Sequence, residues 1–429
     1  MGNREDKEKQ LKLSLTYKGM SNLYLACQSG KTDIVRQILE KCSYHDLNQI
    51  EPNGSTLLHA AAMNGHQDIV RLLIEHGCQR SVVNADRLTA YELAPNDEVR
   101  RLFHRPASSR RERFHNDNVD DCFEIVNELE EESSLPSDKA ASIERKESVQ
   151  KYKTSEEKRH EMGYAASSKA MCRSKLGRLL VDYVHDDAPL ELETMARHLK
   201  EIVDREVAKN DDSEWEKAND LLNRFINHND HSIEHLFHLY TLETRFYRVL
   251  KNDSIPLAIP IYTKLPKLKE RYFQGQSYRG ACMTVSDLEA YEWAVQHPGS
   301  LLQTTNFSST SLNRQIAEEF IATSEKNTNK RTVVFIFHFP KKCDQAINLG
   351  KISDKLPCLS EYEDEAEVLV LPWTLFEVKS VYKNDENDTC SIYLRNVLIP
   401  HKSLLSTFLW TARHSRERDC AFQKYKSKK

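Results

Sequence analysis

Residues 55–75 read Ser-Thr-Leu-Leu-His-Ala-Ala-Ala-Met-Asn-Gly-His-Gln-Asp-Ile-Val-Arg-Leu-Leu-Ile-Glu, and residues 22–40 follow the same pattern. Each copy has a run of small and apolar residues, then a glycine, and then an Asp-Ile-Val-Arg run with further aliphatic side chains. A third beginning, Thr89-Ala-Tyr-Glu-Leu-Ala94, stands 33 residues after Thr56. The pattern predicts helical hairpins, each of which buries its apolar face against the next hairpin.

A period of about 33 residues resembles that of ankyrin repeats. The resemblance covers residues 15–103 and predicts an all-α array of two good copies and one degenerate copy. Because about three repeats are needed for stability, we expect the array to lean on the rest of the chain or on a partner. It carries no chemistry of its own, so we interpret it as a protein-docking module. The alternative is that it only completes the fold.

Composition limits the classes of function. The 429 residues exceed one ordinary domain, and 61 Lys and Arg against 65 Asp and Glu give a net charge of -4, so we expect no nucleic-acid partner. The 10 cysteines form no Cys-x-x-Cys pair, which is typical of reduced intracellular thiols. The sequence has neither a signal-peptide core nor an apolar run of about 18 residues. We therefore expect a cytoplasmic protein without a membrane span.

Two segments are poor in apolar anchors. Residues 104–168 mix basic, acidic and Ser-rich runs, which predicts a charged, disordered linker. Residues 401–429 form a basic C-terminal tail. We interpret both as solvated segments rather than as binding sites.

The region between these segments changes from a helical to an extended pattern. Amphipathic helical spacings run from Met171 to Leu250, and strand-like spacings begin with Arg271–Tyr278 and continue to the end of this region. Helices first and strands later predict an α+β domain. We place this domain at residues 175–400.

Three short motifs lie in the strand-rich half. They are Tyr278-Arg279-Gly280 at the end of a predicted strand, Phe307-Ser-Ser-Thr-Ser311 before a helical pattern, and Glu365-Ala-Glu367 at the start of another strand. Each has an ordinary explanation when it stands alone. The arginine fits a surface ion pair, the Ser and Thr residues fit a helix N-cap, and the two glutamates fit one solvent-facing side of a strand.

In this order, the motifs resemble the Arg, Ser-Thr-Ser, Glu-x-Glu signature of arginine-directed mono-ADP-ribosyltransferases. The resemblance covers residues 175–382, with the strand up to Pro400 attached. It implies an α+β fold with a helical subdomain and a mixed β core. It also implies NAD as co-substrate, with NADP open, an exposed arginine of a protein as the acceptor, and no metal.

The resemblance assigns the NAD-binding residues. Glu367 would stabilise the oxocarbenium-like charge that develops as the bond between nicotinamide and ribose breaks. Arg279 would pair with the phosphates, and Gly280 would let the nicotinamide amide approach the main chain. Ser309 would hold NAD and Glu367 in register. The residues that would support this turn are Thr310 and Ser311.

The resemblance also assigns the acceptor side. Glu365 would share a strand face with Glu367, grip the acceptor guanidinium and help remove its proton. Glutamate at this position implies arginine as the acceptor. We name residues 357–364 the acidic loop, and its Tyr362 would either stack on the acceptor guanidinium or only pack within the loop.

Two rival functions stay open at this point. One is a catalytically inactive ankyrin-repeat adaptor, and the other is an NAD glycohydrolase. The spacing of His228, His231, His235 and His238 could hold zinc, but no His-Glu-x-x-His pattern is present. We therefore predict no metal site.

Overall fold

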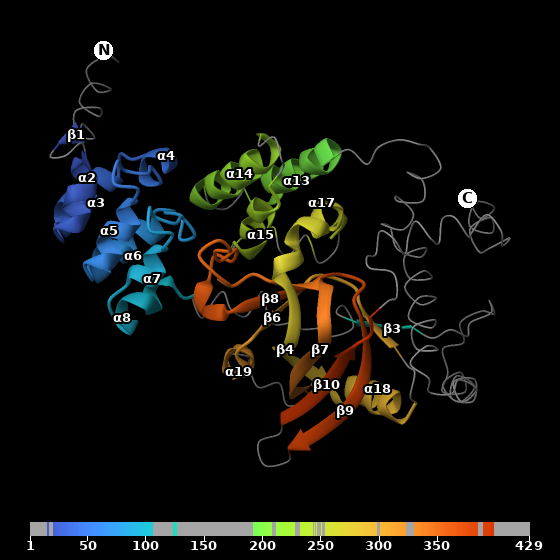
Figure 1. Cartoon of the computed structure of the whole chain (residues 1–429). Helices are drawn as coiled ribbons and strands as arrows, with labels where there is room; N and C mark the ends of the chain where they lie inside the picture. Colours follow the sequence, from blue (N-terminus) through green and yellow to red (C-terminus); the bar gives the residue numbers. More distant parts are fainter. Residues whose placement is uncertain are drawn as a thin grey trace. The chain divides into compact units, whose positions relative to one another are not determined.

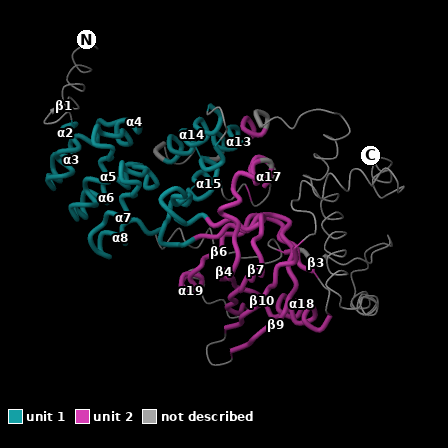
Figure 2. The backbone as a smooth tube through the Cα atoms, in the orientation of Figure 1, with its two compact units in different colours: residues 1–106, 199–247, 349–366 teal, residues 107–198, 248–348, 367–429 magenta. Residues whose placement is uncertain are grey.

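The structure is a computed structural model in which part of the chain is described. The described residues are 15–16, 20–105, 123–126, 192–207, 212–227, 232–242, 244, 246, 250, 254–297, 301–322, 330–384 and 389–398. They fall into two compact units that interleave along the sequence, as Figure 2 shows in two colours. The first unit takes residues 1–106, 199–247 and 349–366, and the second takes residues 107–198, 248–348 and 367–429.

The first unit contains the helices that the repeat predicts, in the blue to cyan part of Figure 1. The helices are α2 (Asn22–Gln28), α3 (Thr32–Leu39), α4 (Tyr44–Leu47), α5 (Leu57–Met63), α6 (Gln67–Glu75), α7 (Ala90–Leu93) and α8 (Asp97–Arg100), followed by the 3-10 turn η2 (Arg101–Phe103). Helix α5 packs against both α2 and α7, and α6 packs against α3 and α8. The predicted helical hairpins therefore stack on one another.

Local sequence explains where these helices begin and turn. Thr89 caps α7, because its hydroxyl accepts from the Glu92 amide while the Glu92 carboxylate accepts from the Thr89 amide. Gly65 turns the chain between α5 and α6 with φ of 71°, a backbone region that favours glycine. Ala60 and Ala61 are almost fully buried, so the small side chains of α5 allow its neighbours to approach closely.

Two later segments complete the first unit. Helices α14 (Asp212–Asn227) and α15 (Glu234–Thr241) pack against each other, and α14 also contacts α4 of the array. Residues 349–366 carry the acidic loop and end in the 3-10 turn η5 (Glu363–Glu365). Helix α13 (Leu192–Glu206) crosses the boundary between the two units along the chain.

The second unit is built on an eight-stranded sheet in the order β3-β5-β9-β10-β7-β4-β6-β8. The strands are β3 (Phe123–Val126), β4 (Tyr272–Thr284), β5 (Leu301–Thr304), β6 (Ser308–Ser311), β7 (Lys330–Asn348), β8 (Glu367–Val370), β9 (Leu375–Asn384) and β10 (Thr389–Asn396). Strands β7 and β10 are parallel, whereas the other neighbours are antiparallel, so the sheet is mixed. This confirms the prediction of a region rich in strands after the repeats.

Helices flank this sheet, and aromatic side chains fill its core. The helical elements are α17 (Ile255–Lys264), η4 (Leu265–Arg271), α18 (Val285–Gln296) and α19 (Arg314–Ala322). Phe335, Phe337 and Phe339 alternate along β7 and are almost fully buried on one face, where Phe376 of β9 contacts two of the three rings edge to face. This packing makes the central strands a firm support for their neighbours.

The linker prediction is wrong at two places. Within residues 104–168 the structure describes 104–105 and 123–126. Residues 123–126 form strand β3, which pairs with β5, and Arg105 is buried. The sequence did not indicate strand β3 or the burial of Arg105, because a four-residue strand and a single arginine in a charged segment form no periodic pattern. The rest of the predicted linker and the basic tail at 401–429 lie outside the described residues, and the predicted domain limits stay predictions.

Candidate active site

The three sequence motifs occupy three neighbouring strands of the sheet. Arg279 lies in β4, Ser309 in β6 and Glu367 in β8, and the sheet order places β6 between β4 and β8. In register, Ser311 stands opposite Tyr278 on one side and opposite Glu367 on the other. Residues far apart in the sequence therefore meet on the neighbouring strands β4, β6 and β8 of the second unit (Figure 1), and β8 also pairs with β7.

Arg279 is tied directly to the Ser-Thr-Ser strand. Its Nη1 donates to the Ser309 carbonyl oxygen at 2.8 Å, and the side chain is buried. The predicted end of this strand at Tyr278 is wrong, because β4 continues to Thr284 and pairs with β7 along this stretch. The longer strand places Arg279 and Gly280 within the sheet instead of at its end, so the backbone of the arginine is held on a rigid element.

The Ser-Thr-Ser stretch is a strand, so its interpretation as a helix N-cap is wrong. Residues 308–311 pair with β4 and β8, and α19 begins only at Arg314. The Thr310 hydroxyl donates to the Val368 carbonyl oxygen at 2.7 Å, which fastens β6 to β8. The Ser311 hydroxyl accepts from the Asn313 amide at 3.0 Å and stabilises the turn that leads to α19.

Glu367 is the first residue of β8, and its side chain is almost fully buried. Burying a carboxylate is costly unless nearby groups compensate for its charge. Active sites commonly contain buried charged groups despite this cost. Glu367 lies opposite Ser311 across the pairing of β6 and β8, and its catalytic role stays a prediction.

The strand argument for Glu365 is wrong. Glu365 ends the 3-10 turn η5, and β8 starts two residues later. Ala366 between the two glutamates has φ of 43°, in the left-handed region that non-glycine residues rarely adopt. The alternation of side chains along a strand therefore does not apply to this pair.

Within the first unit, Glu365 holds a guanidinium from the chain itself. Arg105 Nε donates to Glu365 Oε1 at 2.8 Å, and Arg105 Nη2 donates to Glu365 Oε2 at 3.2 Å. The Arg105 guanidinium carbon lies 3.8 Å from the centre of the Tyr362 ring. Arg105 and Glu365 are only 1% and 3% exposed. The pair is thus a buried two-bond ion pair capped by an aromatic ring.

No pattern in the sequence points to Arg105. The residue follows the last repeat directly and was assigned to the linker. The one feature of the sequence that indicates its burial is its position, because Phe103, two residues earlier, is a buried core residue of the array. Chain that close to a packed core is constrained by it.

The acidic loop has further partners in the first unit. Glu361 accepts from the Ser81 hydroxyl at 2.9 Å and pairs with Lys217 at 3.0 Å. Burial acts to raise the pKa of the Glu361 carboxyl, but Lys217 and His238 outweigh it, and the pKa is held well below its usual range. Glu361 is therefore a charged anchor of the loop.

Glu363 has the opposite behaviour. Burial raises its pKa to about 7; the neighbouring carboxylates of Glu92 and Asp364 add to this rise, whereas a hydrogen bond from Thr89 and the charge of Lys351 oppose it. The residue therefore changes charge near neutral pH.

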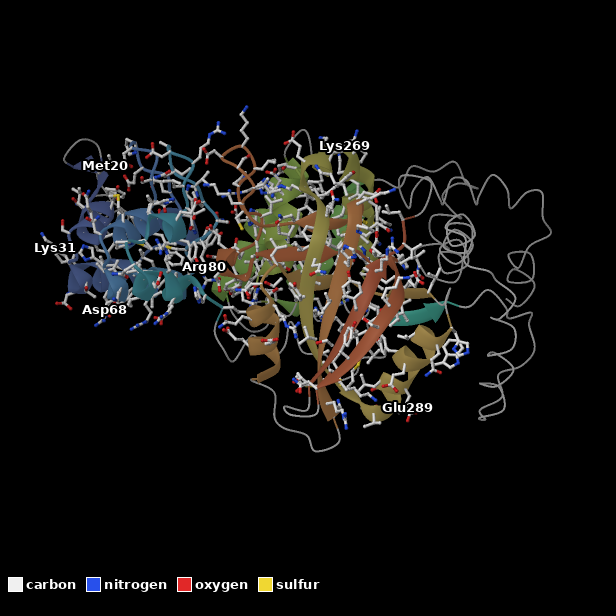
Figure 3. The ribbon with its side chains drawn as sticks, turned by 60° about the horizontal axis from the view of Figure 1, so that its bottom comes forward. Met20, Lys31, Asp68, Arg80, Lys269 and Glu289 are labelled. Atoms are coloured by element: carbon white, nitrogen blue, oxygen red, sulfur yellow. The ribbon has the colours of Figure 1, made fainter. Side chains whose placement is uncertain are left out.

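The end of the array meets this part of the first unit through several other contacts. Lys351 pairs with Glu92 at 2.6 Å, and His104 lies 3.6 Å from Asp364. The Arg80 guanidinium, labelled in Figure 3, lies 4.8 Å from the centre of the Tyr362 ring. Tyr362 thus contacts two arginines from the array side.

Neither a metal-binding cluster nor a membrane-spanning helix is found among the described residues. In the described part of the chain, His, Cys, Asp and Glu side chains form no group of three that could hold a metal ion. Of the four histidines singled out from the sequence, His235 and His238 lie on α15, whereas His228 and His231 are outside the described residues. Among the same described residues, every helix is too short or too polar to span a bilayer.

The N-terminal part of the chain is similar to known ankyrin-repeat sequences. The family model for ankyrin repeats matches residues 4–101 with three copies, which confirms the predicted repeats. The curated relatives include the NAD-capped RNA hydrolase NUDT12 of Homo sapiens, which is 52% identical over 48 residues, 11% of this chain and 10% of that protein. The chain thus spans about a tenth of the length of that relative.

Solved structures similar to the chain include two bacterial proteins. Vis toxin, an ADP-ribosyltransferase from Vibrio splendidus, is 17% identical and matches 50% of this chain and 88% of its own, with a TM-score of 0.25. The type III effector XopAI from Xanthomonas axonopodis pv. citri is 16% identical and matches 52% of this chain and 96% of its own, with a TM-score of 0.33.

Proposed function

We propose that the chain is a mono-ADP-ribosyltransferase that moves ADP-ribose from NAD to arginine side chains of target proteins. The observation that carries the proposal is the adjacency of β4, β6 and β8, with Arg279 bonded to Ser309 and Ser311 opposite Glu367. If the three motifs were an unrelated surface ion pair, helix N-cap and solvent-facing strand, nothing would predict that they lie on neighbouring strands. The meeting of the three motifs therefore favours one shared site.

On the NAD side, the candidate site in the second unit supplies the guanidinium of Arg279 and the carboxylate of Glu367. NAD would bring the bond between nicotinamide and ribose, whose cleavage leaves an oxocarbenium-like cation. Arg279 would bind the phosphates, because a guanidinium offers a fork of donors that matches phosphate oxygens. Gly280 follows it in β4, where its main chain would accept the nicotinamide amide. Glu367 would stabilise the cation through its carboxylate.

Ser309 lies in β6, between the strand that carries Arg279 and the strand that carries Glu367. From there it would keep NAD aligned with Glu367. Thr310 and Ser311 support this role through hydrogen bonds that fix β6 to β8 and to the following turn. A reacting group held by locked neighbours keeps its geometry within fractions of an ångström.

On the acceptor side, Glu365 would bind the guanidinium of the target arginine and take its proton. The bond between ribose and nicotinamide breaks with its electron pair going to nicotinamide, and an arginine nitrogen forms the new bond to the same carbon. The proton that this nitrogen loses passes to Glu365. The products are nicotinamide, an ADP-ribosylated arginine and one proton.

The test is incubation of the whole chain with labelled NAD and agmatine, a small molecule that carries a guanidinium. Transfer of labelled ADP-ribose from NAD to agmatine, together with free nicotinamide, supports the proposal. Nicotinamide without labelled agmatine supports an NAD glycohydrolase, and neither product supports a catalytically inactive adaptor. Repeating the assay with NADP measures which dinucleotide is preferred.

The array has a separate proposed role. Ankyrin repeats expose their stacked faces for partner binding, so we assign residues 15–103 to docking of a target or regulator protein, in the cytoplasm. Capture of the target by the array would raise the local concentration of its arginines near the enzyme.

A further inference from the structure

The candidate acceptor site already contains a guanidinium. The ligand set is the one that a substrate arginine would need: two parallel N–H···O bonds to the Glu365 carboxylate, at 2.8 and 3.2 Å, and a Tyr362 ring at 3.8 Å. Arg105 Nη2 also donates to the Thr241 carbonyl oxygen at 3.4 Å. Glu365, Tyr362 and Thr241 belong to the first unit, as Arg105 does.

The other acidic residues near Glu365 interact with groups other than Arg105. Glu361 pairs with Lys217 at 3.0 Å, and Asp364 lies 3.6 Å from His104. Beyond the acidic loop, Lys351 pairs with Glu92 at 2.6 Å. The segment is thus anchored to the array and to α14 without the pair at Glu365. An arginine placed on the carboxylate that the proposed chemistry assigns to the acceptor calls for another reason.

We infer that Arg105 occupies the acceptor-arginine site in cis and competes with the target arginine. The inference rests on the proposed function, because it takes Glu365 as the acceptor-binding group. Arg105 stands two residues after the last turn of the array, η2, so the array delivers the blocking side chain. An acceptor must displace Arg105 before it can pair with Glu365. A partner that pulls the end of the array away would open the site.

Two consequences separate this role from an ordinary ion pair. Acceptor binding is weakened, because the acceptor and Arg105 need the same oxygens, so the KM for agmatine is raised. Cleavage of NAD without an acceptor uses Arg279 and Glu367 and does not depend on Glu365. Removal of Arg105 therefore lowers the KM for agmatine and leaves the rate of NAD cleavage without an acceptor unchanged.

The experiment compares Arg105→Ala with the unaltered chain. The variant should show a KM for agmatine lower by about tenfold, while nicotinamide release without acceptor stays within about twofold. Arg100→Ala is the matched control, because Arg100 pairs with Asp97 on α8 and lies outside the site. An unchanged KM for agmatine in Arg105→Ala, or an equal fall in Arg100→Ala, overturns the inference. ADP-ribose found on Arg105 itself also overturns it, because Arg105 would then be an acceptor.

A second measurement needs no catalysis. In Arg105→Ala, agmatine or methylguanidine should refill the vacated site and raise the melting temperature, whereas methylamine should not, because it lacks the fork of donors. The unaltered chain should show no such rise. Equal shifts in both proteins overturn the inference. If neither protein cleaves NAD but only the variant responds to agmatine, the proposed function fails while the guanidinium site stands.

Removal of Arg105 leaves a buried carboxylate without its partner, which can prevent folding. Arg105→Lys keeps the charge but loses the planar fork of donor nitrogens and the stacking on Tyr362. This variant should fold and show a KM for agmatine between those of the other two proteins. A KM equal to that of the unaltered chain contradicts competition at Glu365.

Discussion

Ser311 and Glu367 face each other as register partners in the antiparallel strands β6 and β8. This relationship joins the Ser-Thr-Ser motif to the Glu-x-Glu motif, and the bond from Arg279 Nη1 to the Ser309 carbonyl oxygen adds the third motif. Each motif is weak evidence alone. Their convergence on three neighbouring strands of the second unit makes this part of the sheet the candidate site for NAD.

Replacement of Glu367 by Gln should nearly abolish NAD cleavage. The amide has almost the same shape but no charge to stabilise the developing cation, and loss of one such group costs about 10²- to 10³-fold in rate. Nicotinamide release measures the effect, and an unchanged far-UV circular dichroism spectrum shows that the fold is kept. Cleavage within a few-fold of the unaltered rate would remove Glu367 from the mechanism.

Replacement of Arg279 by Lys should weaken NAD binding more than turnover. Lysine keeps the positive charge but offers no planar fork for phosphate, and its ammonium cannot reproduce the guanidinium geometry that reaches the Ser309 carbonyl oxygen. We expect the KM for NAD to rise about tenfold, equal to about 1.4 kcal/mol. A fall in kcat with an unchanged KM would contradict a role in phosphate binding.

Replacement of Glu365 by Gln should reduce transfer to agmatine more than it reduces NAD cleavage. The amide keeps one acceptor oxygen but loses the charge that pairs with a guanidinium and takes its proton. Labelled agmatine and released nicotinamide are measured in the same reaction. Equal losses of both would exclude Glu365 from the acceptor site.

The raised pKa of Glu363 predicts that stability falls between pH 4.5 and about 7. Unfolded chain loses this proton near its ordinary value of 4.5, whereas folded chain keeps it until about pH 7, so the stabilisation is complete below pH 4.5 and is lost as the pH rises. Glu363→Gln imitates the protonated form.

The Gln variant should therefore melt at a higher temperature than the unaltered chain at pH 8 and at a similar temperature near pH 4.5. The groups that shift the pKa of Glu363 besides burial are Thr89, Glu92, Lys351 and Asp364, and all remain in the variant. Scanning calorimetry across this pH range checks the prediction. A constant difference in melting temperature at all pH values would show that Glu363 does not titrate there.

The sequence was informative where a pattern repeats or where several motifs combine. The ankyrin helices follow from the periodic small and aliphatic residues, and the strand-rich half follows from its apolar runs. Arg279, Ser309 and Glu367 were placed together by the order of their motifs. No period or spacing specifies that Ser308–Ser311 pair with strands on both sides, which is why the N-cap interpretation of this stretch failed.

Tertiary contacts explain the remaining differences. Ala366 adopts a left-handed backbone that breaks the expected strand between Glu365 and Glu367. Arg105 pairs with a residue 260 positions away, and an isolated arginine beside charged neighbours gives no sign of such a contact. Short-range sequence patterns report on local structure and burial, whereas a single long-range ion pair depends on the completed fold.

The most direct test of the proposed function is a crystal structure of the Glu367→Gln variant with NAD bound, because this variant should bind the dinucleotide without cleaving it. We predict that the NAD phosphates lie within hydrogen-bond distance of Arg279 and that the ribose carbon bonded to nicotinamide lies against residue 367. NAD bound elsewhere, or with its phosphates away from Arg279 and β6, would contradict the assignment.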